Sequence, residues 1–387
     1  MNNRFVALLG VSLLVTANAS ADKLKDALSS LQELRNFRGK AGETRHLLDP
    51  VTVTVGSPGA VETGEESSYI AIHLRSIVLR GGARLSLRDA NDVEIWQRAT
   101  AINTEDLWLP PVDGEKAILR CENATTASCD CHAVIDLFAR GHALKQIETA
   151  NEPPVGLRQI CDECDLEDTS CPNLPAALQQ RKKAVARILL AGTDTCSGFL
   201  VGDQGHLITN VHCIANETEA RNAIFEFGAE EADCSTDCTR ILKATAERFE
   251  RGAQWVGSDP TIDIAIVKLP AQLAQTVGHL VLRKSEAADS ENIGIVQHPR
   301  GESRKYSIDN VRSRAAAPCG VGLPATIAYR ADTRGGSSGS PVISLQPAGD
   351  HAVIAIHECL GCPNRGIPSE LVFQRLGHLL PASAFSP

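Results

Sequence analysis

Short apolar runs, rich in β-branched residues and often alternating with polar ones, recur along most of this 387-residue chain. Such runs predict β-strands, and few of the stretches between them have a helical period. We therefore predict an all-β chain in which a small β-sandwich precedes a double antiparallel β-barrel. The runs are VTVTV, YIAIHLRSIVL, ARLSLRD, VEIW, AILRC and AVIDLF between residues 49 and 138, then AVARILLAG, SGFLVG, HLITNV, DIAIVKL and AVIAIH from Ala184 onward.

The first 21 residues have the pattern of a secretory signal peptide. Arg4 precedes the apolar run FVALLGVSLLV, and Ala19-Ser20-Ala21 supplies small residues at a cleavage site. The apolar run is too short to span a bilayer. We therefore expect a secreted or periplasmic protein that is cleaved near Ala21 and has no membrane partner afterwards.

Changes of pattern divide the rest of the chain into three parts. Residues 22–150 are predicted to be a propeptide or a retained accessory domain. They begin with a short amphipathic helix over residues 22–40, where leucines recur at helical spacing. Residues 151–182 contain cysteines and a Pro-Pro pair and are predicted to be a linker or lead-in. Residues 183–387 are predicted to form the barrels.

Thirteen cysteines follow the signal-like segment. In an exported chain they favour disulfides, and their odd number leaves at least one outside intrachain pairs. The CxxC pairs Cys161/Cys164 and Cys359/Cys362 would also suit a zinc ribbon. They lie far apart in the sequence and export favours oxidation, so we expect neither a metal nor a cofactor.

The formal net charge of −9 argues against nucleic acid or an anionic membrane as the main partner. It leaves the oligomeric state open.

The stretch TRGGSSGSPV at residues 333–342 could by composition be a linker, but it runs straight into the strand-like PVISL. His212 in HLITNVHC and Asp263 in TIDIAIVKL precede it. A hydroxyl, an imidazole and a carboxylate are the groups that serine catalysis requires. Asp259 lies near Asp263 but lacks the apolar run, which favours a turn residue.

Three boxes, in the order His, Asp, Ser along the chain, resemble those of trypsin-like serine peptidases: Thr209-Asn210-Val211-His212, the strand after Asp263 and Gly336-Ser337-Ser338-Gly339-Ser340-Pro341. The resemblance covers about residues 164–375, and Asn210 is typical of the V8-like and HtrA-like branch. It implies a chymotrypsin-like double barrel with Ser338 as nucleophile, His212 as base and Asp263 as its orienting acid. It also implies an oxyanion hole from the amides of Gly336 and Ser338.

The resemblance implies disulfides as well. Cys196 and Cys213 stand where the family has a bridge beside the catalytic histidine. The segment from Cys164 to Cys171 is similar to the N-terminus of lysyl-endopeptidase-like bacterial enzymes. That similarity implies pairing of Cys164 with Cys359 or Cys362, and of Cys171 with Cys234 or Cys238. Enzymes of that group often carry a β-rich propeptide.

Ser337 occupies the position at which trypsins have an aspartate that pairs with the new N-terminal amine. A hydroxyl cannot form that ion pair, so we expect the oxyanion loop to be held in another way.

Two residues bear on substrate preference and point in opposite directions. Asp332 lies six residues before Ser338, at the position of the trypsin specificity acid. A loop-anchoring role is the alternative. His357, in AIHECLGC, is at a position where glutamyl-endopeptidase relatives use a histidine to bind an acidic side chain. The two could also pair with each other.

Together these features predict a secreted serine endopeptidase that acts on proteins or peptides through an acyl-enzyme. Two alternatives remain open. One is a catalytically inactive binding protein on a peptidase fold, and the other is a peptidase delivered by a glycan- or cell-surface-binding N-terminal domain.

Overall fold

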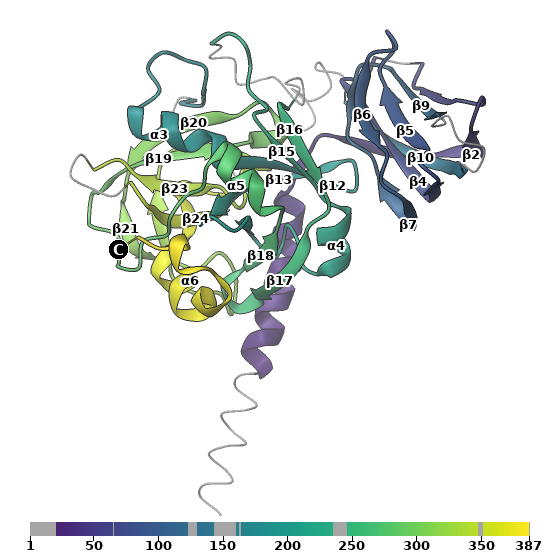
Figure 1. The fold of residues 1–387 in the computed structure, drawn as a ribbon. Helices are drawn as coiled ribbons and strands as arrows, with labels where there is room; N and C mark the ends of the chain where they lie inside the picture. The colour runs from purple at the N-terminus through teal and green to yellow at the C-terminus, as the bar shows by residue number, and fades with distance from the viewer. Residues whose placement is uncertain are drawn as a thin grey trace, which may run out of the picture.

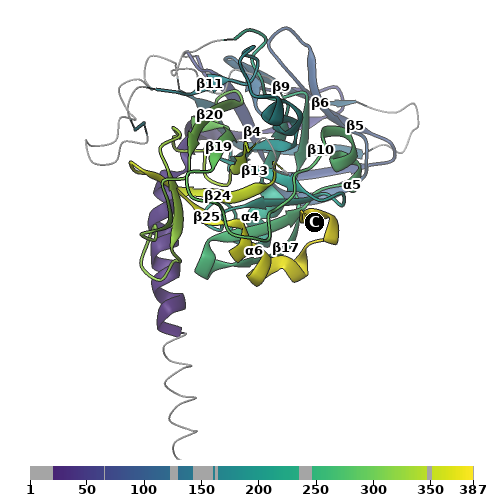
Figure 2. The same cartoon turned by 90° about the vertical axis from the view of Figure 1, so that its left-hand side faces the viewer.

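The computed structural model describes residues 21–64, 66–122, 130–142, 160–161, 164–234, 246–346 and 351–386. Within these ranges the chain is mainly antiparallel β-structure with few helices. No helix among them has the length and apolar character needed to cross a membrane. Figures 1 and 2 show a smaller β-structure beside a larger one, with the N-terminal helix along the larger.

The smaller β-structure, which we call the N-terminal sandwich, is made of two antiparallel sheets in the order β2-β10-β4-β7, with β8 beside β4, and β3-β9-β5-β6. Their facing apolar side chains, such as Ile72 of β4 and Leu119 of β9, share one buried core. The strands are β2 (Gly42–Thr54), β3 (Gly59–Glu62), β4 (Tyr69–Arg80), β5 (Arg84–Arg88), β6 (Glu94–Arg98), β7 (Ile102–Trp108), β8 (Val112–Asp113), β9 (Lys116–Glu122) and β10 (Asp130–Gly141).

The N-terminal helix ends earlier than the pattern predicted. Among the described residues it covers 21–34, and the chain then passes through the 3-10 turn η1 (Arg35–Phe37) into strand β1 (Gly39–Lys40). The chain leaves the helix early because β1 pairs with strand β13 of the larger β-structure. Leu31 and Leu34 of the helix are buried against the larger β-structure, whereas Leu24 and Leu28 are exposed.

The larger β-structure is a double barrel formed by two antiparallel sheets, as the strand pattern predicted. Within the described ranges each sheet has eight strands, in the orders β16-β15-β12-β13-β14-β18-β17 plus β1, and β11-β20-β19-β23-β24-β25-β22-β21. The first sheet contains β12 (Val185–Leu190), β13 (Asp194–Val201), β14 (His206–Thr209), β15 (Ile224–Phe227), β16 (Arg248–Arg251), β17 (Gln254–Asp259) and β18 (Ile264–Lys268). The second contains β11 (Glu167–Asp168), β19 (Asn292–Gln297), β20 (Lys305–Asn310), β21 (Ser313–Ala316), β22 (Thr326–Tyr329), β23 (Pro341–Ser344), β24 (Val353–Cys359) and β25 (Asn364–Pro368).

Short helices connect and cover the barrels. They are α3 (Ala176–Arg181), η2 (Lys182–Ala184), α4 (Glu217–Asn222), η3 (Pro260–Ile262), α5 (Ala271–Val277), η4 (Pro299–Gly301), α6 (Ser369–Leu376), η5 (Gly377–Leu379) and η6 (Ala382–Ala384).

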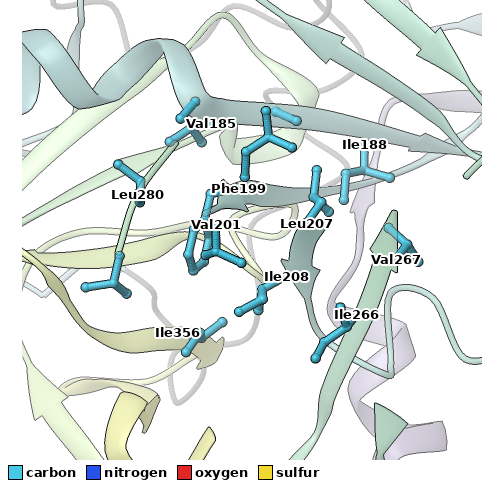
Figure 3. Close-up of a cluster of buried hydrophobic side chains, with 14 of the residues drawn as sticks. Val185, Ile188, Phe199, Val201, Leu207, Ile208, Ile266, Val267, Leu280 and Ile356 are labelled. Carbon is cyan, nitrogen blue, oxygen red and sulfur yellow. The ribbon is translucent and has the colours of Figure 1, made fainter. Parts of the chain in front are cut away.

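The core of the double barrel joins its two sheets. Phe199 and Val201 of β13, Ile266 of β18 and Ile356 of β24 all lie in one cluster of buried side chains (Figure 3). Aliphatic side chains dominate this cluster. A shared apolar core fixes the two sheets against each other, and this places the loops at their junction.

The N-terminal sandwich docks on the double barrel through a small apolar patch. Tyr69 and Trp108 from the sandwich pack with Leu189 of β12. The Tyr69 hydroxyl donates to the Gly192 carbonyl over 2.8 Å, and Arg251 Nε donates to the Trp108 carbonyl over 3.0 Å. A Cβ on Gly192 would lie 2.5 Å from the Trp108 ring, so the glycine permits this close contact.

A buried ion pair stabilises the first barrel. The Arg187 side chain is almost fully buried, with Nε 2.6 Å from Glu226 Oε2 and Nη1 3.0 Å from the Gly301 carbonyl.

We predict that Glu226→Ala lowers the free energy of unfolding by roughly 3–5 kcal/mol, because it leaves the buried Arg187 guanidinium without its counter-ion. Urea unfolding measures this. Glu217→Ala, which removes an exposed partner of Arg221, should cost less than about 1 kcal/mol; equal losses would contradict the prediction.

Candidate active site

His212 and Asp263 form a tight, fully buried pair between the two sheets. His212 lies in the turn after β14, and Asp263 lies directly before β18. His212 Nδ1 is 2.6 Å from Asp263 Oδ2, and the His212 amide donates to Asp263 Oδ1 over 2.9 Å. Both side chains are 0% exposed. One carboxylate oxygen therefore orients the imidazole and the other holds the His212 backbone, which leaves Nε2 as the free edge of the ring.

The backbone around Asp263 is held by Asn210, a role that the sequence interpretation missed. Asp263 adopts the left-handed conformation with φ 51°, which non-glycine residues seldom adopt, although aspartate tolerates it better than most. Its carbonyl accepts from Asn210 Nδ2 over 2.9 Å and from the Val211 amide over 3.2 Å. Asn210 thus ties the loop of the acid to the loop of the histidine.

Ser338 reaches the same place from the second sheet, in the loop before β23. Its carbonyl accepts from the Ser197 amide over 2.8 Å and lies 3.9 Å from Cys213 Sγ, next to His212. Its hydroxyl donates to the Glu358 carbonyl over 3.4 Å. The three residues expected from the sequence therefore meet at the junction of the sheets, with the Ser338 hydroxyl directed at β24 instead of the imidazole.

In the part of the chain that the structure describes, the loop around Ser338 contains two glycines with positive φ and two amides without a hydrogen-bond acceptor. Gly336 and Gly339 have φ of 96° and 88°, a region open to glycine. The amides of Ser337, Gly339 and Ser340 donate to backbone carbonyls. Within the described ranges the amides of Gly336 and Ser338 donate to no group. These two N–H groups are the pair that the sequence assigned to the oxyanion hole.

A hydroxyl network holds this loop in place of an ion pair. Ser197 Oγ donates to the Gly336 carbonyl over 2.9 Å and accepts from the His298 amide over 3.0 Å. Ser337 Oγ accepts from the Arg334 amide over 3.1 Å. Ser197 is a second residue that the sequence interpretation missed, although its place one residue after Cys196 was a usable signal.

Five disulfides are formed among the described residues: Cys121–Cys131, Cys161–Cys362, Cys171–Cys234, Cys196–Cys213 and Cys319–Cys359. The expected pairing of Cys164 was wrong: Cys359 and Cys362 are joined to Cys319 and Cys161. Of the two partners expected for Cys171, the structure joins it to Cys234. The other, Cys238, lies outside the described residues. All four sulfurs of the two CxxC pairs lie in disulfides, which differs from a zinc ribbon.

Asp332 anchors the lead-in to the barrels. Its Oδ1 accepts from the Cys161 amide over 2.8 Å and its Oδ2 from the Asp165 amide over 2.9 Å. The Asp332 amide donates in turn to Asp165 Oδ1 over 3.1 Å. Both Asp332 oxygens therefore bind backbone, which is the loop-anchoring arrangement.

His357 pairs with Tyr329, and the structure does not pair it with Asp332. Its Nδ1 lies 2.7 Å from the Tyr329 hydroxyl, and its side chain is fully buried. Burial, with a smaller contribution from His212, lowers the pKa of His357 to about 3. His357 is thus a neutral imidazole at ordinary pH and offers a single N–H instead of a positive charge.

Glu358 is a buried acid beside the pair. Burial, and then the charge of Asp263, raise the pKa of Glu358 well above its ordinary value. Neither carboxyl oxygen has a hydrogen-bond partner within the described ranges. We infer that this side chain is protonated next to Asp263, which keeps a second negative charge away from the imidazole.

Residues 21–41 lie over this site. The helix packs Ala27, Leu31 and Leu34 against Val211, Ala265 and Cys359. Strand β1 then pairs Gly39 with Thr195 of β13, next to the Cys196–Cys213 bridge. His212 is 0% and Ser338 is 1% exposed in this arrangement. The N-terminal segment thus packs against the loops and strands that carry this site.

Residues 160–357, just over half of the chain, match the family model described as lysyl endopeptidase, C-terminal domain. The chain belongs to this family. The lysyl endopeptidase family match begins just before the lead-in held by Asp332 and ends at His357. It includes all three residues of the site.

The chain is also similar to two curated proteins. It is 37% identical over 220 residues to a secreted RxLR effector protein 73 of Plasmopara viticola, covering 54% of this chain and 53% of that protein. It is 25% identical over 152 residues to protease Do-like 5, chloroplastic, of Arabidopsis thaliana, covering 38% and 44%. The chain spans about half the length of the curated relatives it matches.

Solved structures with similar folds include a crystal structure of Deg5, with a TM-score of 0.40 and 18% identity over 54% of this chain and 93% of that chain. A structure of Glu endopeptidase in complex with MPD has a TM-score of 0.40 and 17% identity over 57% and 97%.

The Asp165–Asp332 contact predicts a pH-dependent stability. Burial and the neighbouring Asp332 charge raise the pKa of Asp165 from 3.8 to about 8. A raised carboxyl pKa stabilises the fold fully below pH 4, and this contribution is lost as the pH rises towards 8. Since Asp165 is partly solvent-exposed, we expect Asp165→Asn to stabilise the protein by only about 1 kcal/mol at pH 8 relative to pH 4. Thermal unfolding across this pH range measures it.

Asp289→Asn, which removes an exposed carboxylate, is the control for that experiment. Parallel pH profiles for wild type and Asp165→Asn would contradict the prediction.

Proposed function

We propose that this protein is a secreted serine endopeptidase that hydrolyses protein or peptide substrates through Ser338, His212 and Asp263. The observation that carries the proposal is the buried His212–Asp263 pair at 2.6 Å, facing a serine in a turn with two available amides. The family match supports peptidase chemistry, since its description names an endopeptidase. The N-terminal signal-like pattern and the disulfides support export.

Catalysis would begin when the Ser338 hydroxyl rotates from the Glu358 carbonyl towards His212 Nε2. The imidazole takes the hydroxyl proton as Oγ attacks the scissile carbonyl, and Asp263 stabilises the resulting imidazolium. The amides of Gly336 and Ser338 bind the oxyanion. His212 then protonates the leaving amine, and water hydrolyses the acyl-enzyme by the same route in reverse.

The described conformation is proposed to be a zymogen. A substrate cannot reach Ser338 while residues 21–41 cover it, so activity requires that this segment be displaced. The N-terminal sandwich would then act as part of a propeptide, because the chain runs directly from the helix through β1 into β2, the first strand of the sandwich.

A fluorophosphonate probe tests the nucleophile. We expect the full chain to be labelled only after limited proteolysis or displacement of residues 21–41, and Ser338→Ala to abolish labelling in every form. Ser340→Ala, two residues further on, should be labelled like wild type. Intact, folded protein that resists labelling in all forms would favour the alternative of a catalytically inactive binding protein. The similarity to a secreted effector protein agrees with that alternative.

Asp263 is expected to act through the imidazole. Asp263→Asn should lower kcat by about 10⁴-fold while leaving the buried geometry similar, because the amide stabilises the wrong tautomer. Initial rates on a peptide substrate measure this. Asp259→Asn is the matched control: Asp259 accepts from Thr261 at the start of η3 and pairs with Arg375, away from the imidazole. A comparable loss in the control would refute the assignment.

A further inference from the structure

Arg38 enters the double barrel beside the catalytic pair and is held from several sides. Its Nε donates to the His212 carbonyl and its Nη2 to the Cys213 carbonyl, both over 2.8 Å. Its Nη1 lies 3.4 Å from Asp194 Oδ2, and its Nη2 lies 3.7 Å from Glu219 Oε2. The side chain is 11% exposed. Two carbonyls and two carboxylates thus surround one guanidinium.

The acceptors of Arg38 belong to elements that the barrel itself holds through other hydrogen bonds. The two carbonyls belong to the loop that Asp263 holds through the His212 amide. Glu219 Oε2 accepts from the Ala215 amide over 2.8 Å, and the Glu219 amide donates to Asn216 at the start of α4, which resembles a capping box. Asp194 opens β13. Such preorganised acceptors make a built site.

The arrangement suits a guanidinium better than an ammonium. Its planar fork presents several N–H donors in fixed directions, so one group reaches both carbonyls and both acids. A lysine offers a single charged centre, and Lys40 indeed contacts Asp194 alone. The acidic pair also attracts Arg35, which binds Glu219 over 3.0 Å.

The N-terminal segment passes the site in a defined direction. The helix lies on Cys359 at the end of β24, Arg38 lies at His212, and Gly39 pairs with Thr195 of β13. In the proposed mechanism His212 protonates the leaving amine, so residues that follow the scissile bond lie on the His212 side. Arg38 and β1 occupy that side, and they are the C-terminal part of the segment, as a substrate's leaving group would be.

We propose that Asp194, Glu219 and the carbonyls of His212 and Cys213 form a subsite for an arginine side chain on the leaving-group side of the catalytic centre. Arg38 fills it in this structure, and an arginine of a peptide substrate fills it when residues 21–41 are displaced. The substrate part of this inference rests on the proposed function. The subsite itself rests on the contacts of Arg38.

A binding experiment tests the subsite without activity. The full chain carries Ser338→Ala to prevent cleavage and Arg38→Glu to release the segment, because glutamate meets the charges of Asp194 and Glu219. The probe is a fluorescent peptide with the sequence of residues 35–41, RNFRGKA. We expect saturable binding by fluorescence polarisation, with affinity at least tenfold lower when alanine replaces the second arginine and a smaller loss with lysine.

Controls separate the subsite from general charge attraction. Alanine in place of the peptide lysine should change affinity less than about threefold, since Lys40 is half exposed. The double change Asp194→Asn with Glu219→Gln should abolish the preference for arginine over alanine. Gly39→Val is a second way to release the segment, because a Cβ there would lie 2.2 Å from Thr195 Oγ1. The subsite is overturned if the Arg38→Glu and Gly39→Val chains are both folded and neither binds the peptide. It is also overturned if alanine in place of the second arginine leaves the affinity unchanged.

A cleavage experiment then tests the substrate. The Arg38→Glu chain with Ser338 intact is incubated with a peptide library, and the cut sites are read by mass spectrometry. We expect arginine to be enriched about tenfold among the first two residues after the cut bond, and the enrichment to vanish with Asp194→Asn and Glu219→Gln. Cuts without such enrichment overturn the substrate role. Arginine-dependent peptide binding without any cuts would refute the proposed function and leave the subsite standing.

Discussion

The hydrogen bond between His212 and Asp263 is the interaction on which the site depends. A carboxylate buried without water is costly unless its oxygens are satisfied, and here the ring and the amide of one residue satisfy both. The two residues come from loops that follow β14 and precede β18, and these strands are direct neighbours in the first sheet. Strand pairing therefore brings acid and imidazole together, and Asn210 fixes the backbone between them.

The N-terminal segment is attached to the same loops. Arg38 binds the carbonyls of His212 and Cys213, so the N-terminal segment is attached to the backbone beside the imidazole. Among the residues that the structure describes, none forms a hydrogen bond to the Nε2 edge of His212. The apolar face of the helix covers Val211 and Cys359, which would otherwise be open to water. The packing of this segment thus leaves the loops of His212 and Asp263 assembled. Displacement of the segment would expose the carboxylates of Asp194 and Glu219 and the carbonyls of His212 and Cys213. These groups would then need another cation or water as a partner.

Much of this arrangement could be predicted from the sequence, for physical reasons that differ between parts. Strands such as YIAIHLRSIVL have strong periodicity and were placed well, whereas β7, INTEDLW, has consecutive polar residues on both faces and was missed. His212, Asp263 and Ser338 stood in recognisable local patterns. Cys164 could not be paired, because disulfide connectivity depends on loop positions that local sequence does not encode. The contact of Arg38 with His212 joins residues 174 apart and has no local signal at all.

The neutral network around Ser337 bears on how such a site could be switched on. In an arrangement based on an aspartate and a new N-terminal amine, cleavage supplies the charge that orders the oxyanion loop. Here Ser197 already joins the Gly336 carbonyl to the His298 amide, and Ser337 accepts from Arg334, in the uncleaved chain. Gly336 and Gly339 already have the positive φ that the turn requires. Cleavage is therefore not needed to build the loop. In the proposed zymogen, residues 21–41 separate this conformation from an accessible one, so activation would be the removal of a steric block held by Arg38 and Gly39.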